Sequence, residues 1–109
     1  MSYSDELGYI LDRRPLYRGG VNSETLSAGK TLTGRDAIFQ ILKNDASGAV
    51  VITLVPEIDG AICWVHCTST SAHGLEIKND AAGAITTLSA GQAGLFVCDG
   101  TNWHNVIKA

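Results

Sequence analysis

The sequence predicts an all-β protein, a compact antiparallel β-sandwich or barrel with a short N-terminal arm. From residue 21 onward, short apolar runs are separated by clusters of Gly, Asn, Asp and Ser, at the spacing of about 8–12 residues that all-β folds show. The chain has 109 residues, the size of one domain. Only 17% of them are charged, against roughly 25% in soluble domains. We therefore expect copies of the chain to cover part of its surface.

Residues 1–20 differ in composition from the rest, and we interpret them as an arm that precedes a β domain over residues 21–109. The stretch SDELGYILD could form a short helix capped by Ser4. Tyrosine and arginine are common in protein interfaces, and the arm holds several of both. The candidate docking residues are Tyr9, Arg13, Arg14, Tyr17 and Arg18.

The first long apolar run, GAVVITLV over 48–55, is apolar on both faces and ends at Pro56. Before it, Thr33 and Asp36 have the spacing of a helix capping box, but the β-branched and aromatic residues that follow favour a strand over 37–43. After it, the sequence predicts strands over 61–67, 75–78, 84–88, 95–98 and 101–107.

The Asp99-Gly100 pair between the last two runs predicts a two-residue hairpin turn. In that register Cys98 faces Thr101, and Phe96 faces Trp103. A four-residue turn is the alternative, and it places Cys98 beside Trp103 instead.

Residues 63–67, CWVHC, have the composition of a metal site. In a strand, however, Cys63 and Cys67 point to one face and lie about 13 Å apart, while His66 points to the other. Two zinc ligands must lie within about 4.6 Å of each other, so we predict a core strand. A site completed across strands by Cys98 and His104, as in a small zinc-dependent domain, stays open as the minority interpretation.

Composition and motifs also exclude classes of function. The net charge of −3 and the lack of a basic stripe argue against nucleic acid as a partner. The sequence has no apolar stretch long enough for a membrane helix and no signal peptide at its N-terminus. The odd count of three cysteines favours a reducing compartment. Nucleophile-elbow and phosphate-loop motifs are absent, so we expect no enzyme activity and no cofactor.

The stretch GAITTLSAGQAGLFVCDGTNWHNV resembles a recurrent segment of small virion proteins of tailed bacteriophages. The earlier stretches AGKTLTGRDA, VVITLVP and DGAICWV resemble the preceding strands of the same β-module, so the resemblance covers roughly residues 26–107. This module occurs in capsid decoration (cement) proteins and in domains of tail or head fibres. The cysteines of CWVHC depart from the pattern, where a small polar residue is expected.

The resemblance implies a trimeric β-sandwich or barrel with a role in the virion. We expect a capsid decoration protein that is made in the host cytoplasm, binds the major capsid protein on the outer surface of the head as a homotrimer, and stabilises it through its arm. The alternative is a receptor- or glycan-binding fibre module, in which Trp64 or Trp103 stacks on a sugar ring.

Overall fold

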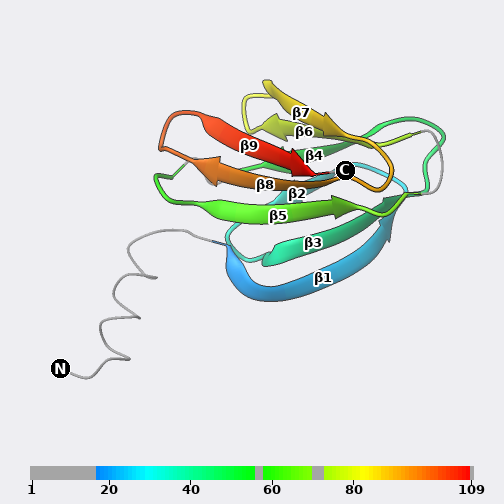
Figure 1. Cartoon of the computed structure of the whole chain (residues 1–109), viewed down its shortest axis with the longest axis horizontal. Helices are drawn as coiled ribbons and strands as arrows, with labels where there is room; N and C mark the ends of the chain where they lie inside the picture. Colours follow the sequence, from blue (N-terminus) through cyan, green and yellow to red (C-terminus); the bar gives the residue numbers. More distant parts are fainter. Residues whose placement is uncertain (1–16, 56–57, 70–72, 109) are drawn as a thin grey trace.

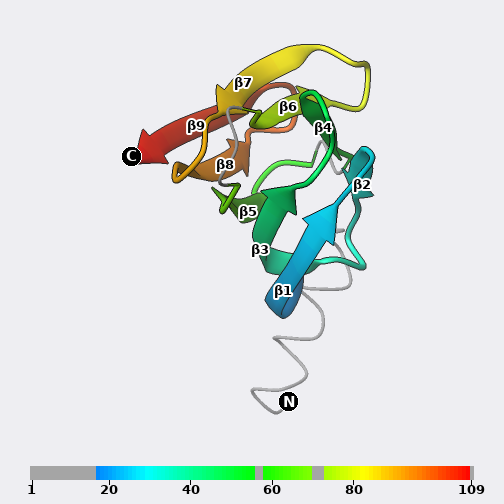
Figure 2. The same cartoon turned by 90° about the vertical axis from the view of Figure 1, so that its right-hand side faces the viewer.

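The computed structural model describes residues 17–55, 58–69 and 73–108, which form two β-sheets packed face to face (Figure 1). Figure 2 shows the two layers from the side, turned by a quarter from the first view. Sheet A has the strand order β1-β3-β5-β8-β9, and sheet B has the order β2-β4-β6-β7. The all-β sandwich class is confirmed, and neither sheet closes into a barrel. The strands are β1 Arg18–Leu26, β2 Lys30–Leu32, β3 Ala37–Asn44, β4 Val50–Leu54, β5 Ile62–Cys67, β6 Leu75–Asn79, β7 Ala84–Leu88, β8 Ala93–Cys98 and β9 Trp103–Lys108.

The first six strands alternate between the sheets, so the chain winds as a coil and its neighbouring turns pair in parallel. The pairs β1–β3, β3–β5, β2–β4 and β4–β6 are parallel, whereas β5–β8, β6–β7 and β8–β9 are antiparallel. The expectation of antiparallel pairing is therefore wrong for the first six strands. Side chains alternate with the same period of two in both arrangements, so alternation could not distinguish them. The run over 50–55, apolar on both faces, was a usable signal, because parallel strands are usually buried on both sides.

Two local predictions about turns have different outcomes. The segment at 37–43 is a strand, as predicted. The Thr33–Asp36 pair closes a turn instead of starting a helix: the Asp36 side chain accepts the amide of Thr33 (2.8 Å), and β3 begins at the next residue. The two-residue turn after β8 is wrong, and its four-residue alternative is right, since Cys98 pairs with Trp103. The carboxylate of Asp99 accepts the amides at 101 and 102 (2.9 and 2.7 Å), which satisfies the backbone of the longer loop.

The core lies between the sheets and consists of inward-facing side chains from both. Leu42, Val65 and Phe96 of sheet A meet Ile52 and Leu75 of sheet B, and all are fully buried. Strand β1 adds little to this core because most of its residues are polar, and for the same reason its residue pattern does not predict a strand. None of the described segments is a helix long and apolar enough to cross a membrane.

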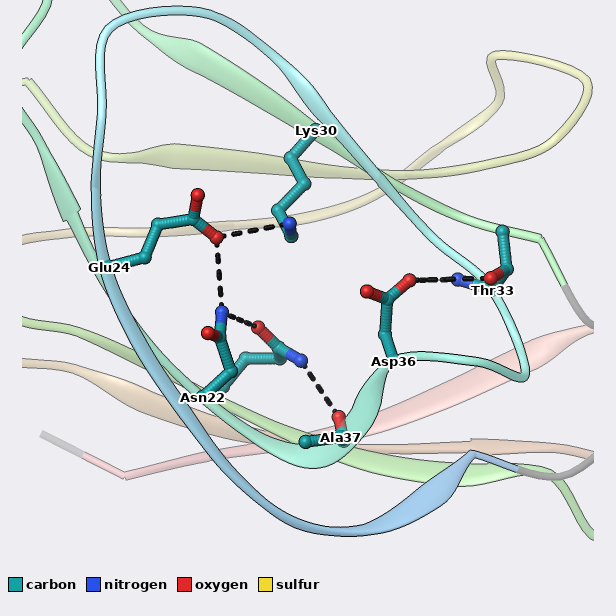
Figure 3. A network of polar contacts seen from close by, with 7 residues as sticks. Asn22, Glu24, Lys30, Thr33, Asp36 and Ala37 are labelled. Carbon is teal, nitrogen blue, oxygen red and sulfur yellow. Dashed lines mark hydrogen bonds and ion pairs between the residues drawn. The ribbon is translucent and has the colours of Figure 1, made fainter.

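A polar network closes the sandwich at the end where β1 and β2 are edge strands (Figure 3). The amide of Asn22 donates to Glu24 (3.0 Å) and to Gln40 (2.9 Å), and Lys30 contacts Glu24 at 3.0 Å. The Lys30 ammonium, and then the Asn22 amide, hold the pKa of Glu24 below its ordinary value. The buried Gln40 amide donates in turn to the carbonyl of Ala37 (2.8 Å). The coil therefore ends in polar groups, as terminal turns of stacked repeats do.

Candidate interaction surface

The outer face of sheet A carries an uninterrupted row of apolar side chains, one from each strand. The strand registers place these residues side by side across the whole sheet. Four of them are the large apolar residues exposed to solvent in the described structure: Val21 (63%), Phe39 (44%), Trp64 (39%) and Val106 (67%). Contiguous exposed apolar patches on a folded domain mark binding sites. The row consists of Val21, Phe39, Trp64, Leu95 and Val106.

Two aromatic rings form the centre of this apolar row. Phe39 and Trp64 lie directly opposite each other on the parallel strands β3 and β5, and their rings stack with centroids 6.1 Å apart and planes 10° apart. A shallow depression of about 270 Å³ lies over them, between β1 and β8. Val21, Ile41 and Ala93 contribute to its walls, and His66 borders it. The result is a slightly hollowed apolar surface on the outside of sheet A.

Polar groups on this face lie away from the row. In the described structure the charged or titratable side chains of its strands are Lys43, His66, His104 and Lys108, and the Asp99 carboxylate reaches the face through its 2.9 Å contact with His104. The outer face of sheet B differs, since residues such as Thr31, Thr53, Glu76 and Lys78 point outward there. One face of a sandwich is normally solvated in this second way. The apolar surface is therefore confined to sheet A.

Of the candidate docking residues of the N-terminal arm, the structure describes only Tyr17 and Arg18. Tyr9, Arg13 and Arg14 lie outside the described residues, as does the helix considered for SDELGYILD. Tyr17 is buried, and its hydroxyl donates to the carbonyl of Leu32 (3.3 Å). Arg18 is exposed, begins β1, and donates to the carbonyl of Arg35 (3.2 Å). The β structure thus begins within the segment interpreted as an arm, and Tyr17 belongs to the core.

The CWVHC stretch lies in β5, and the predicted alternation is confirmed. Cys63, Val65 and Cys67 point into the core, whereas Trp64 and His66 point outward. All three cysteines of the chain are buried and none forms a disulfide. Burial raises the pKa of the Cys63 thiol to about 12. Among the described residues, no three His, Cys, Asp or Glu side chains gather in a way that could hold a metal ion.

His104, weighed as a metal ligand, and Trp103, weighed as a sugar-stacking residue, lie on opposite faces of β9. His104 points outward, and its Nε2 lies 2.9 Å from the carboxylate of Asp99. Backbone amides, Asn102 first, and then His104 hold the pKa of Asp99 below its ordinary value. Trp103 is 9% exposed and packs in the core. Of the two tryptophans weighed as sugar-stacking residues, only Trp64 is exposed enough to contact a ligand.

Apart from Trp64, the residues of this apolar row do not stand out in the sequence as surface residues. Phe39, Leu95 and Val106 fall in predicted strands, where alternation does not say which of two apolar faces is outermost, and Val21 falls in no predicted strand. A signal was present: β3, β5 and β8 all have apolar residues on both faces.

Comparisons with protein-family models, with curated proteins and with solved structures found no match.

Proposed function

We propose that the chain is a non-enzymatic capsid decoration protein of a tailed bacteriophage, which binds the outer surface of the head as a homotrimer and stabilises it. The sequence resemblance over residues 26–107 supports this role. One structural observation adds to it: a rigid sandwich exposes a five-strand apolar row on one face and ordinary polar residues on the other. Such a face is expected of a subunit that works by binding other proteins.

The proposed mechanism is mechanical. Each trimer bridges neighbouring capsid subunits, so its binding free energy opposes their separation under internal DNA pressure. A ligand that binds only the assembled state stabilises that state by linkage. In this proposal the arm residues Arg13 and Arg14 contact the major capsid protein. The apolar face of sheet A remains available for a second contact.

Co-sedimentation with expanded heads of the phage that carries this chain tests the proposal. We expect the protein to pellet with expanded heads and to raise the temperature at which they release DNA. The double variant Arg13→Glu/Arg14→Glu should bind heads more weakly, because it reverses the charge of the arm. The control Lys78→Glu changes the charge of a lysine on the outer face of sheet B and should bind like the wild type. Absence of wild-type binding to expanded heads overturns the proposal.

The stacked pair of Phe39 and Trp64 supports a second candidate, a glycan-binding module of a phage fibre. Aromatic faces exposed on a sheet can stack on sugar rings, and here both rings are partly exposed. In this case binding to a glycan array should be lost in Trp64→Ala. Trp103→Ala is unsuitable for the test, because Trp103 is in the core and its loss would disturb the fold.

A further inference from the structure

The geometry points to copies of this same chain as the partner of the outer face of sheet A, with the β1–β3 half of one face packed against the β8–β9 half of another. This inference rests on the proposal that the protein acts as a homo-oligomeric binding module, and it names the surface that holds the copies together. The order of the apolar side chains and the positions of the charged side chains on this face favour a second copy as its partner.

The order of the apolar row makes the face complementary to itself. β5 is the central strand of sheet A, so Trp64 is the midpoint of the row, with two apolar residues on either side. Copies related by an axis parallel to β5 meet with their strand order reversed. Val21 then lies opposite Val106 of the next copy, and Phe39 lies opposite Leu95.

The charges on the face fit the same arrangement. In the next row along the strands, Ser23, Ile41, His66, Ala93 and Lys108 lie side by side. Reversing the strand order places Lys108 opposite Ser23 and Ala93 opposite Ile41, so no two lysines of this row meet. The described carboxylate at this face, Asp99, is already paired with His104 of its own copy (2.9 Å), so it does not call for a basic partner.

The parallel pairing of strands in sheet A is an independent reason to expect that another protein surface covers its outer face. β1, β3 and β5 are parallel, and parallel sheets are normally buried on both faces. The core covers one face of these strands, but none of the described segments crosses the other (Figure 1). The parallel strands β2, β4 and β6 have an uncovered outer face too, but Thr, Glu and Lys make it suited to water.

The extent of the face sets the expected strength of association. Five strands spaced by about 4.8 Å and about six residues long give a flat footprint on the order of 400 Å². A standard stable interface takes about 800 Å² from each partner. We therefore expect association that depends on concentration, and it should be measured over a range of concentrations.

A charge-pair experiment tests the arrangement. Sedimentation velocity is measured for the full chain from about 1 μM to about 1 mM, a range that covers weak self-association. Val21→Glu alone and Val106→Lys alone should each raise the dissociation constant by about tenfold or more, because each buries an unpaired charge. An equimolar mixture of the two variants should recover association, since Glu at 21 then meets Lys at 106 of the other copy. Recovery should be full in a pair and partial in a trimer, because a mixed ring of three keeps one unpaired charge where each single variant has three.

Controls separate loss of association from loss of fold. Val21 and Val106 are mostly exposed, and the variants should melt like the wild type when monomeric. Thr31→Glu places the same charge on β2, the corresponding edge strand of sheet B, and should leave association unchanged.

Three outcomes overturn the inference: a wild type that stays monomeric, single variants that associate like the wild type, or a mixture that does not recover. A dimer that follows the charge-pair pattern would support the interface and contradict the trimer of the proposed function. Head binding, measured with the arm variant, tests that function separately.

Discussion

Replacing Asn44 with alanine should destabilise the protein more than any other single loss of a polar side chain at a turn. Asn44 ends β3 and is 2% exposed. Its amide donates to the carbonyls of Gly48 and Gly74 (both 2.9 Å), and its oxygen accepts the amide of Ala46 (2.7 Å). One side chain thus fixes the turn after β3 and ties it to the beginning of β6.

The expected magnitude follows from these three hydrogen bonds. Each contributes about 1 kcal/mol net, so Asn44→Ala should cost about 3 kcal/mol. The carbonyl of Gly74 keeps one partner, the amide of Val50 at 3.4 Å, which limits the cost of leaving it buried. At roughly 4–8 °C per kcal/mol for a domain near this size, the melting temperature should fall by more than about 12 °C.

Guanidinium unfolding followed by tryptophan fluorescence measures this loss, and Asn79→Ala is its matched control. Asn79 also accepts two turn amides, those of Ala81 and Gly83 (3.0 and 2.7 Å), but at a solvent-accessible turn where water replaces them. We expect that variant to lose only about 1 kcal/mol. Equal losses in the two variants, with unchanged denaturant slopes, would refute the reasoning.

Two further predictions concern the core. Stability should fall as pH rises from about 9 toward 12, because the thiol of Cys63 ionises near 8.5 when unfolded, whereas burial raises its pKa to about 12 in the fold. Between these two pH values the folded state holds a proton that the unfolded state has lost. Cys63→Ala should therefore reduce the fall of the unfolding free energy with pH by up to about 1.4 kcal/mol per pH unit. An unchanged pH dependence in that variant would contradict the prediction. Gly74→Ala should unfold at much lower denaturant than Gly48→Ala, because a methyl group at 74 collides with the carbonyl oxygen of Leu88 and one at 48 meets nothing; similar midpoints would argue against this packing.

Local chemistry made several parts of the fold predictable. The strand at β5 and its alternation followed from the residue types of CWVHC, and the strand over 37–43 followed from its β-branched and aromatic content. The loop after β8 was harder, because Asp99 and Gly100 suit both a two-residue and a four-residue connection. The hydrogen bonds of the Asp99 carboxylate to the amides at 101 and 102 decide between them.

The candidate interaction surface could be predicted only in part. Trp64 could be singled out from the sequence only as a candidate to stack on a sugar ring, and the structure places it on the outer face of β5. Its partners in the apolar row come from four other strands, and their alignment depends on register across the whole sheet. A shift of one residue in any strand would turn its row member into the core. Packing of the two inner faces sets that register, and no short stretch of sequence contains it.

The sequence by itself determined that this chain is all-β, where most of its strands lie, and that Cys63 and Cys67 share a buried face, because side-chain type and alternation act within a few residues. The tertiary structure decided that the first six strands wind in parallel between two sheets, since pairing partners lie far apart along the chain and alternation is the same for either direction. It also decided that Val21, Phe39, Trp64, Leu95 and Val106 form one exposed row. That row exists only once five strands have come together in a single register.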